Sequence, residues 1–198
     1  MPNWCSTDYC FYSDDYDELK RFFDLSKKVI EYSENKDSKY FKSWLGNFFI
    51  LNNEDIDNNI PCKGEISYID KNIENNHFYM ETVSAWCPCN ELFDYILSKY
   101  FKNIEYVYKA EEPGNDYFVN SDIEHTYIPS EYYVKDFNIN NDEYEILTFD
   151  SESDIIEYYY ELFNEDNIEF NNYNDVINFA SNHGHDLSIS KYRMVVKE

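Results

Sequence analysis

The spacing of apolar and polar residues predicts a chain in which strands alternate with amphipathic helices. Residues 3–12 are rich in Trp, Tyr, Phe and Thr, which favours a first strand. Over residues 15–32 apolar side chains recur at the helical period, and Asp15 and Glu18 have the spacing of a capping box. We expect Glu18 on the solvated face of this helix. Its predicted buried face contains Leu19, Phe22, Phe23, Ser26, Val29 and Ile30.

Shorter patterns continue this alternation to the end of the chain. Strands are predicted at residues 65–69, 77–85, 104–110, 117–119, 132–137, 144–149 and 187–196, and in part of residues 44–51. Helices are predicted at residues 90–101, 151–163 and 175–182, the last of them stopping at Gly184. The helix at 151–163 is expected to turn inward Ile155, Tyr158, Tyr159 and Leu162. This order predicts an α+β fold with helices packed on one face of an antiparallel sheet.

The composition supports a globular chain. Of the 198 residues 20% are aromatic, including 21 Tyr and 15 Phe, which is ample apolar area for a core. A composition shift divides the chain into a main domain at residues 1–138 and an acidic strand–helix–strand extension at residues 139–198. We expect the extension to pack on the same fold.

Acidity is the strongest functional signal in the composition. The formal net charge is −24, and residues 110–198 hold 21 acidic against 4 basic residues. An AT-rich genome would explain the abundant Asn, Tyr and Ile, but it would supply Lys as freely as Glu, so the acidity looks selected. Such a field repels nucleic acid backbones and anionic membranes, and it favours cationic partners.

The number of cysteines, the length of the apolar runs and the N-terminal residues together predict the cell compartment of the protein. The number of cysteines is odd, no apolar run approaches the ~20 residues of a membrane span, and the N-terminus lacks a signal pattern. We therefore expect a cytoplasmic protein with free thiols.

Three short motifs resemble one family. The opening Met-Pro-Asn-Trp-Cys-Ser (residues 1–6), Ala85-Trp86-Cys87-Pro88 and the turn Glu112-Pro113-Gly114 occur in the order seen in the YubB-like family. The resemblance covers roughly residues 1–120. It implies a ferredoxin-like antiparallel sheet with helices on one face, here extended by the acidic C-terminal α/β segment, and a gene of phages and plasmids. It supplies no catalytic residues, and Cys89 departs from the pattern, which commonly has a second proline there.

Two sequence clusters raise other chemistry. Cys87-Pro88-Cys89 is a redox or metal fragment, or else buried thiols at a strand–helix junction, which we favour because the second half of a zinc site is missing. His183-Gly184-His185-Asp186 is a metal site, or else a helix-ending turn, which we favour because no third ligand cluster accompanies it. No phosphate loop, nucleophile elbow or calcium loop is present. We predict no enzyme activity, no cofactor and no metal.

The function predicted from charge is imitation of a nucleic acid. Ordered carboxylates can occupy the Arg and Lys groups that a nucleic-acid-binding protein reserves for phosphates. With a mobile-element family, this predicts a counter-defence protein that inhibits a basic host complex, such as a CRISPR effector or a restriction system. The predicted partner-binding residues are Glu143, Glu145, Asp150, Glu152, Asp154, Glu157, Glu161, Glu165, Asp166 and Glu169.

Three alternatives stay open. An adaptor or assembly protein would bind through its Tyr-rich faces, with charge serving solubility only, and at least one of Tyr158, Tyr159 and Tyr160 is expected to be exposed. A metal enzyme would use His183 and His185. The charged face would otherwise have no specific partner at all.

Overall fold

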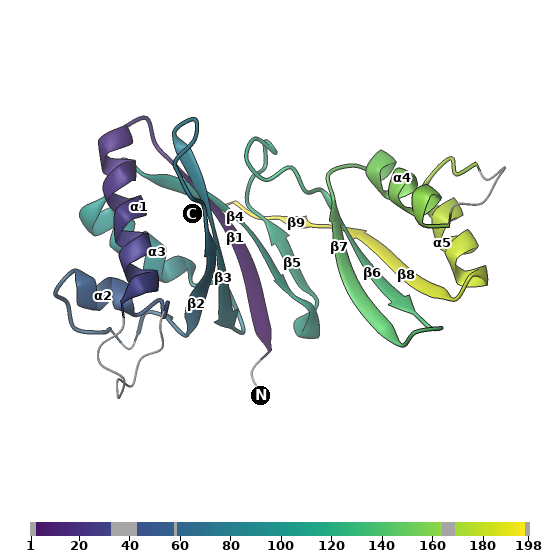
Figure 1. The fold of residues 1–198 in the computed structure, drawn as a ribbon, viewed down its shortest axis with the longest axis horizontal. Coiled ribbons are helices and arrows are strands. Elements are labelled where there is room, and N and C mark those ends of the chain that lie inside the picture. Colours follow the sequence, from purple (N-terminus) through teal and green to yellow (C-terminus); the bar gives the residue numbers. More distant parts are fainter. Residues whose placement is uncertain (1–2, 33–42, 58, 164–168, 197–198) are drawn as a thin grey trace.

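The structure is a computed structural model that describes residues 3–32, 43–57, 59–163 and 169–196. Within these ranges the chain forms a six-stranded mixed sheet and a three-stranded antiparallel sheet, accompanied by helices. The two sheets lie between two groups of helices, α1 to α3 on one side and α4 and α5 on the other (Figure 1). The predicted α+β class is confirmed.

The first sheet has the strand order β2-β3-β1-β4-β5-β9. Neighbouring strands run antiparallel, except that β5 and β9 are parallel. The strands are β1 (Trp4–Tyr12), β2 (Gly64–Ile69), β3 (His77–Ala85), β4 (Glu105–Glu112), β5 (Tyr117–Asn120) and β9 (Arg193–Met194). The helices beside this sheet are α1 (Tyr16–Glu31), α2 (Asn47–Leu51) and α3 (Asn90–Tyr100), and a short 3-10 turn, η1 (Pro113–Asn115), joins β4 to β5.

An aromatic core fills the space between the first sheet and its helices. Phe11 of β1 stacks on Phe78 of β3, with ring centroids 5.4 Å apart, and meets Phe22 of α1 edge-on at 4.9 Å. Phe93 of α3 packs edge-on against Phe11 at 5.3 Å. Because side chains alternate along a strand, Trp4 and the other even-numbered residues of β1 point to the opposite, helix-free face.

The second sheet has a smaller core of its own. Its strands are β6 (Tyr132–Asn138), β7 (Glu143–Phe149) and β8 (His185–Lys191), in the order β7-β6-β8, and its helices are α4 (Glu152–Phe163) and α5 (Tyr173–Asn182). Val134 lies at the centre of this core, under Ile155 and Tyr159 of α4 and Val176 of α5, all with no exposed area. Each acidic element is therefore held on a packed framework.

Three aromatic side chains join the two sheets. Phe118 of β5 stacks on Tyr133 of β6 with centroids 3.9 Å apart and ring planes 5° apart. Tyr192, which lies between β8 and β9, closes the cluster and meets Tyr133 edge-on at 5.4 Å. The chain crosses from the second sheet to the first at this point. The Tyr192 N–H still donates to Glu131 O, next to β6, whereas the Val195 N–H already donates to Asn120 O of β5.

Several predicted details were wrong. Residues 47–51 of the predicted part-strand at 44–51 form the helix α2, in which Phe48 and Phe49 are fully buried. Only Trp44 makes a strand-like contact, an isolated antiparallel bridge with Glu65. The predicted last strand at 187–196 is split between the two sheets as β8 and β9. Glu18 is buried, and its carboxylate accepts the Asn103 N–H at 3.2 Å.

The inward face of α4 is narrower than predicted. Ile155 and Tyr159 are fully buried, whereas Leu162 is 47% exposed and Tyr158 is 36% exposed. Residues on both sides of position 138 belong to the second sheet, through β6 and β7, and the division at 138 stays a prediction. No helix in the described ranges is long and apolar enough to cross a membrane.

Candidate functional site

We call the first sheet with α1 to α3 the first unit, and the second sheet with α4 and α5 the second unit. Six of the ten predicted partner-binding carboxylates lie on the surface of the second unit. They belong to β7, to α4 and to the segments beside these elements, and none of them forms an ion pair with a cation of the described chain. We call this set the C-terminal acidic surface: Glu143, Glu145, Asp150, Glu157, Glu161 and Glu169. Because no cation of the described chain neutralises them, their full charge is presented to solvent.

The other four predicted residues have different surroundings. Glu152 is partly buried, and its carboxylate accepts the Tyr173 N–H at 3.0 Å, which ties α4 to the start of α5. Asp154 accepts the Ser151 hydroxyl at 2.8 Å, and that hydroxyl accepts the Asp154 N–H at 3.3 Å, as in a helix cap. Both carboxylates are thus engaged in local structure. Glu165 and Asp166 lie outside the described residues.

Exposed aromatic and apolar side chains accompany the C-terminal acidic surface. Tyr160 is 49% exposed and Leu162 is 47% exposed, both on α4. Tyr144, 54% exposed, lies on the opposite face of β7 from Glu143 and Glu145. The Tyr158 ring rests edge-on against Phe149 at 5.5 Å. Burial and then the nearby carboxylate of Glu145 raise the pKa of Tyr158, so α4 and β7 contribute to one continuous region.

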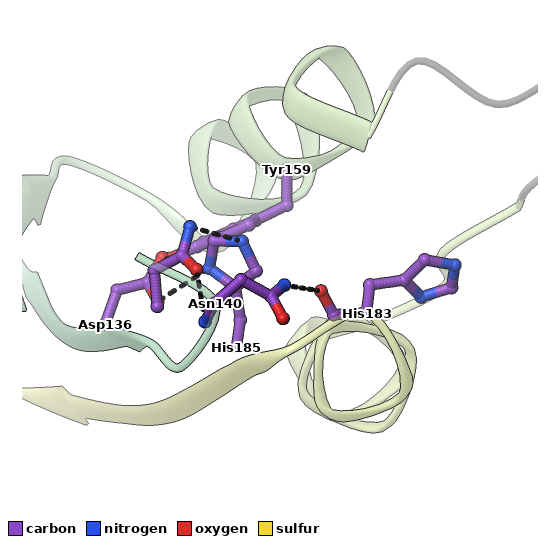
Figure 2. A network of polar contacts seen from close by, with 6 residues as sticks. Asp136, Asn140, Tyr159, His183 and His185 are labelled. Carbon is purple, nitrogen blue, oxygen red and sulfur yellow. Dashed lines mark hydrogen bonds and ion pairs between the residues drawn. The ribbon is translucent and has the colours of Figure 1, made fainter. Parts of the chain in front are cut away.

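A buried polar network lies beneath this surface (Figure 2). The Asp136 carboxylate, 6% exposed, lies 2.8 Å from Nδ1 of His185 and accepts the Tyr159 hydroxyl at 3.0 Å. A carboxylate only accepts hydrogen bonds, so its contact fixes a proton on Nδ1 of His185. Nε2 of His185 lies 3.4 Å from Nδ2 of Asn138. The network thus links β6, β8 and α4.

Within the described residues, the side chains of His183, His185 and Asp186 do not converge on one point. His183 stacks on Phe179 with ring centroids 4.0 Å apart, and Asp186 is exposed on the opposite face of β8 from His185. Gly184, with φ of +86°, ends α5 as predicted. No group of three potential ligand residues that could hold a metal occurs in the described ranges.

Asp136 was missed in the sequence. It occupies an inward position of the strand pattern, two residues after the buried Val134. A carboxylate at such a position must find hydrogen-bond donors when the strand is buried. That signal was available, but neither His185 nor Tyr159 could be identified as its donor without the register of the second sheet.

The three family-like motifs meet at one end of the first sheet. Trp4 pairs with Ala85 across β1 and β3, and the Trp86 N–H donates to Asn3 O at 2.9 Å. The buried carboxylate of Glu112 accepts the N–H groups of Gly114 and Asn115, at 3.0 and 2.9 Å. Asn3 packs against Gly114, where a Cβ atom would lie only 2.5 Å from Asn3 Nδ2.

The thiols near these motifs are mostly inert. Of the two thiols predicted to be buried at the strand–helix junction, Cys89 is buried, but Cys87 is exposed, so the prediction was wrong for Cys87. Cys5, Cys10 and Cys62 are buried as well. Burial raises the pKa of Cys5 to about 11 and the pKa of Cys89 to about 12, so neither thiol forms a nucleophilic thiolate near neutral pH. All five are free.

Comparison with known proteins gives no relative from which a function could be inferred. No family model, no curated protein and no solved structure matches this chain.

Proposed function

We propose that this protein is a non-enzymatic inhibitor that binds a basic, nucleic-acid-binding protein of its host in the cytoplasm. The C-terminal acidic surface occupies the Arg and Lys groups that the partner uses for phosphates. The observation that carries this proposal is the set of six exposed carboxylates without ion-pair partners in the described chain. Because a mimic of a polyanion must hold its charges in place, their attachment to a packed sheet and helix also supports it.

The proposal includes a mobile-element origin and a ferredoxin-like first unit. The order β4-β1-β3-β2, entirely antiparallel, with α1 after β1 and α3 after β3, supports a ferredoxin-like arrangement. Convergence of the three motifs that resemble the YubB-like family at one end of that sheet supports the family assignment. Phages and plasmids that carry such genes encounter CRISPR effectors and restriction complexes, which we propose as targets.

A second function is favoured by the exposed tyrosines. Tyr160 on α4 and Tyr144 on the other face of β7 are large exposed side chains of low conformational entropy, which suits an adaptor that binds through aromatic contacts on both faces. In that case charge would serve solubility, and the affinity would respond little to salt.

The test compares two triple variants with the same net charge. The first is Glu145→Gln, Glu157→Gln and Glu161→Gln on the C-terminal acidic surface. The matched control is Asp14→Asn, Glu31→Gln and Glu124→Gln, three exposed acids elsewhere with no ion pair in the described chain. Proteins captured from host lysate at low salt are identified, and the wild type is then tested for displacing labelled nucleic acid from the captured partner.

A mimic gives a defined set of outcomes. The partner binds nucleic acid and this protein competitively, affinity falls steeply with salt, and the first triple loses about 100-fold in affinity while the control keeps it. An adaptor instead tolerates the first triple and loses its partner on Tyr144→Ser with Tyr160→Ser. Simultaneous binding of nucleic acid and this protein to the partner would refute mimicry.

A further inference from the structure

Two adjacent cavities at the end of the first sheet form what we call the Trp groove. One has a volume of about 670 Å³ and the other about 440 Å³, and both are lined by Trp44, Lys63 and Ala85. Trp86 lines the larger cavity and Trp4 the smaller one. All three tryptophans of the chain thus lie at one groove, on a unit different from the one that carries the C-terminal acidic surface.

The side chains of two of these tryptophans are more than half exposed to solvent. Trp4 is 57% exposed and Trp86 is 56% exposed, so neither contributes its full area to the core. Trp86 also has a φ of +75°, a left-handed conformation that is rare and strained for a bulky residue. Local packing does not explain why a strained backbone position carries an exposed indole. Occupancy by a ligand does, since the indole then buries its area against that ligand.

The charges around the groove favour a cationic ligand. Glu65 and Asp57 line it, and neither forms an ion pair with a cation in the described ranges. The only cation among the described lining residues is Lys63, which is exposed. The net charge of −24 opposes approach of an anion and steers a cation toward the surface.

The tryptophan rings supply the matching contact. In the described chain the Lys and Arg side chains of the protein that contact aromatic rings lie over Phe and Tyr rings. Lys27, for example, lies over Phe23 at 4.1 Å and Lys191 over Tyr132 at 4.8 Å. No such contact places a cation over Trp4 or Trp86. Indole is the best cation–π acceptor among side chains, and Arg is its most frequent partner.

We infer that the Trp groove is a binding site for an arginine-bearing peptide segment of a protein partner. Guanidinium groups lie over the indoles of Trp4 and Trp86, and Glu65 and Asp57 supply the counter-charge. Binding there needs none of the carboxylates of the C-terminal acidic surface, so the inference does not depend on the proposed inhibitory function.

The tryptophans themselves report on the site. We would titrate the full chain with a capped hexa-arginine peptide at ~0.15 M salt, follow intrinsic tryptophan fluorescence, and measure affinities by calorimetry. A capped hexa-glutamine peptide is the control for non-specific contact. We expect a saturable shift in tryptophan emission with hexa-arginine only. The shift should persist in the Glu145→Gln, Glu157→Gln and Glu161→Gln triple, which separates the groove from the C-terminal acidic surface.

Single substitutions then test whether the affinity for hexa-arginine changes in the direction that a cation-binding groove predicts. Trp4→Ala and Glu65→Gln should each weaken hexa-arginine binding about 3- to 10-fold, whereas Lys63→Ala should tighten it. All three positions are exposed, which keeps the folded state intact. The inference is overturned if hexa-arginine leaves the emission unchanged, or if Lys63→Ala weakens binding. A saturable response to adenosine monophosphate or to a neutral oligosaccharide in place of hexa-arginine would assign the groove to another ligand class and would equally overturn it.

Discussion

The ring of Phe118 lies flat on the ring of Tyr133, with centroids 3.9 Å apart and an angle of 5° between the planes. This stack joins β5 of the first sheet to β6 of the second. The Lys135 ammonium lies beside both rings, 5.0 Å from the centre of the Phe118 ring and 5.8 Å from that of Tyr133. The two sheets otherwise rest on separate cores, so the stack is a main point of mechanical coupling between them.

Phe118→Ala should uncouple the two units. Removal of a buried phenyl ring costs about 3 kcal/mol of unfolding free energy, and here the loss falls on the junction. We expect urea denaturation to change from one transition to two, one for each sheet, when it is followed by tryptophan fluorescence and by far-ultraviolet circular dichroism. Ile123→Ala, at a residue 50% exposed, is the control and should leave a single transition. A single transition with an unchanged midpoint in Phe118→Ala would show that the coupling lies elsewhere.

Asp136→Ala should destabilise the second unit. Without that carboxylate, Nδ1 of His185 and the Tyr159 hydroxyl lose their buried acceptor, at a cost of about 3 kcal/mol. Asp186→Ala, at the exposed position after His185, is the matched control and should change stability by less than ~0.5 kcal/mol. Equal unfolding midpoints for the two variants would mean that the network of Figure 2 contributes nothing to stability.

Trp86→Gly should keep or raise the stability of the protein. Glycine adopts a φ of +75° without steric cost, while the lost indole is 56% exposed. Trp86→Ala keeps the strained backbone and should be less stable than Trp86→Gly by about 1 kcal/mol. Thermal unfolding of the pair measures this difference. A large loss of stability in both variants would indicate a packing role for the indole and would weaken the case for a ligand at the Trp groove.

Alkaline pH should unfold the protein as its buried tyrosines ionise. Burial raises the pKa of Tyr9 well above the ordinary value of 10.0, and burial followed by Glu111 does the same for Tyr192. The folded state therefore holds these protons more tightly than the unfolded state. Stability is complete below pH 10 and falls as pH rises beyond it, because only the unfolded chain then ionises freely.

Tyrosinate absorbance and circular dichroism, recorded together against pH, check this. The buried phenols, Tyr9 and Tyr192 among them, should ionise only in the step that abolishes the dichroism signal. Ionisation of all 21 tyrosines near pH 10 with the secondary structure intact would contradict the burial described here.

Local sequence signals predicted most elements but not their partners. Half of the capping box predicted for α1 formed: the Asp15 carboxylate accepts the Glu18 N–H at 3.0 Å, but the Asp15 N–H donates to the Ser13 hydroxyl and not to Glu18. The burial of Glu18 did not follow, because it depends on the Asn103 backbone, 85 residues away in sequence. Residues 47–51 were misassigned because a short apolar run has the same composition in a strand and in a helix.

The residues of the candidate sites also differ in whether the sequence alone could identify their role. The carboxylates of the C-terminal acidic surface could be identified from charge, because an acidic side chain on a polar face stays exposed in nearly any fold. The contact between Glu152 and the Tyr173 N–H needed the position of α4 against α5, whereas the cap formed by Ser151 and Asp154 is local to the start of α4. The Trp groove could not be foreseen, because Trp4, Trp44 and Trp86 come from three distant segments.

By itself the sequence determined the α+β class, most strands and helices, and the negative field of the protein. These properties depend on periodicity and on charge, which are local or additive along the chain. Tertiary structure alone decided that Tyr192 would split the last predicted strand between two sheets, that Asp136 would meet His185, and that three tryptophans would line one groove. Each of these depends on strand register and on contacts between residues far apart in sequence, and short-range patterns do not encode them.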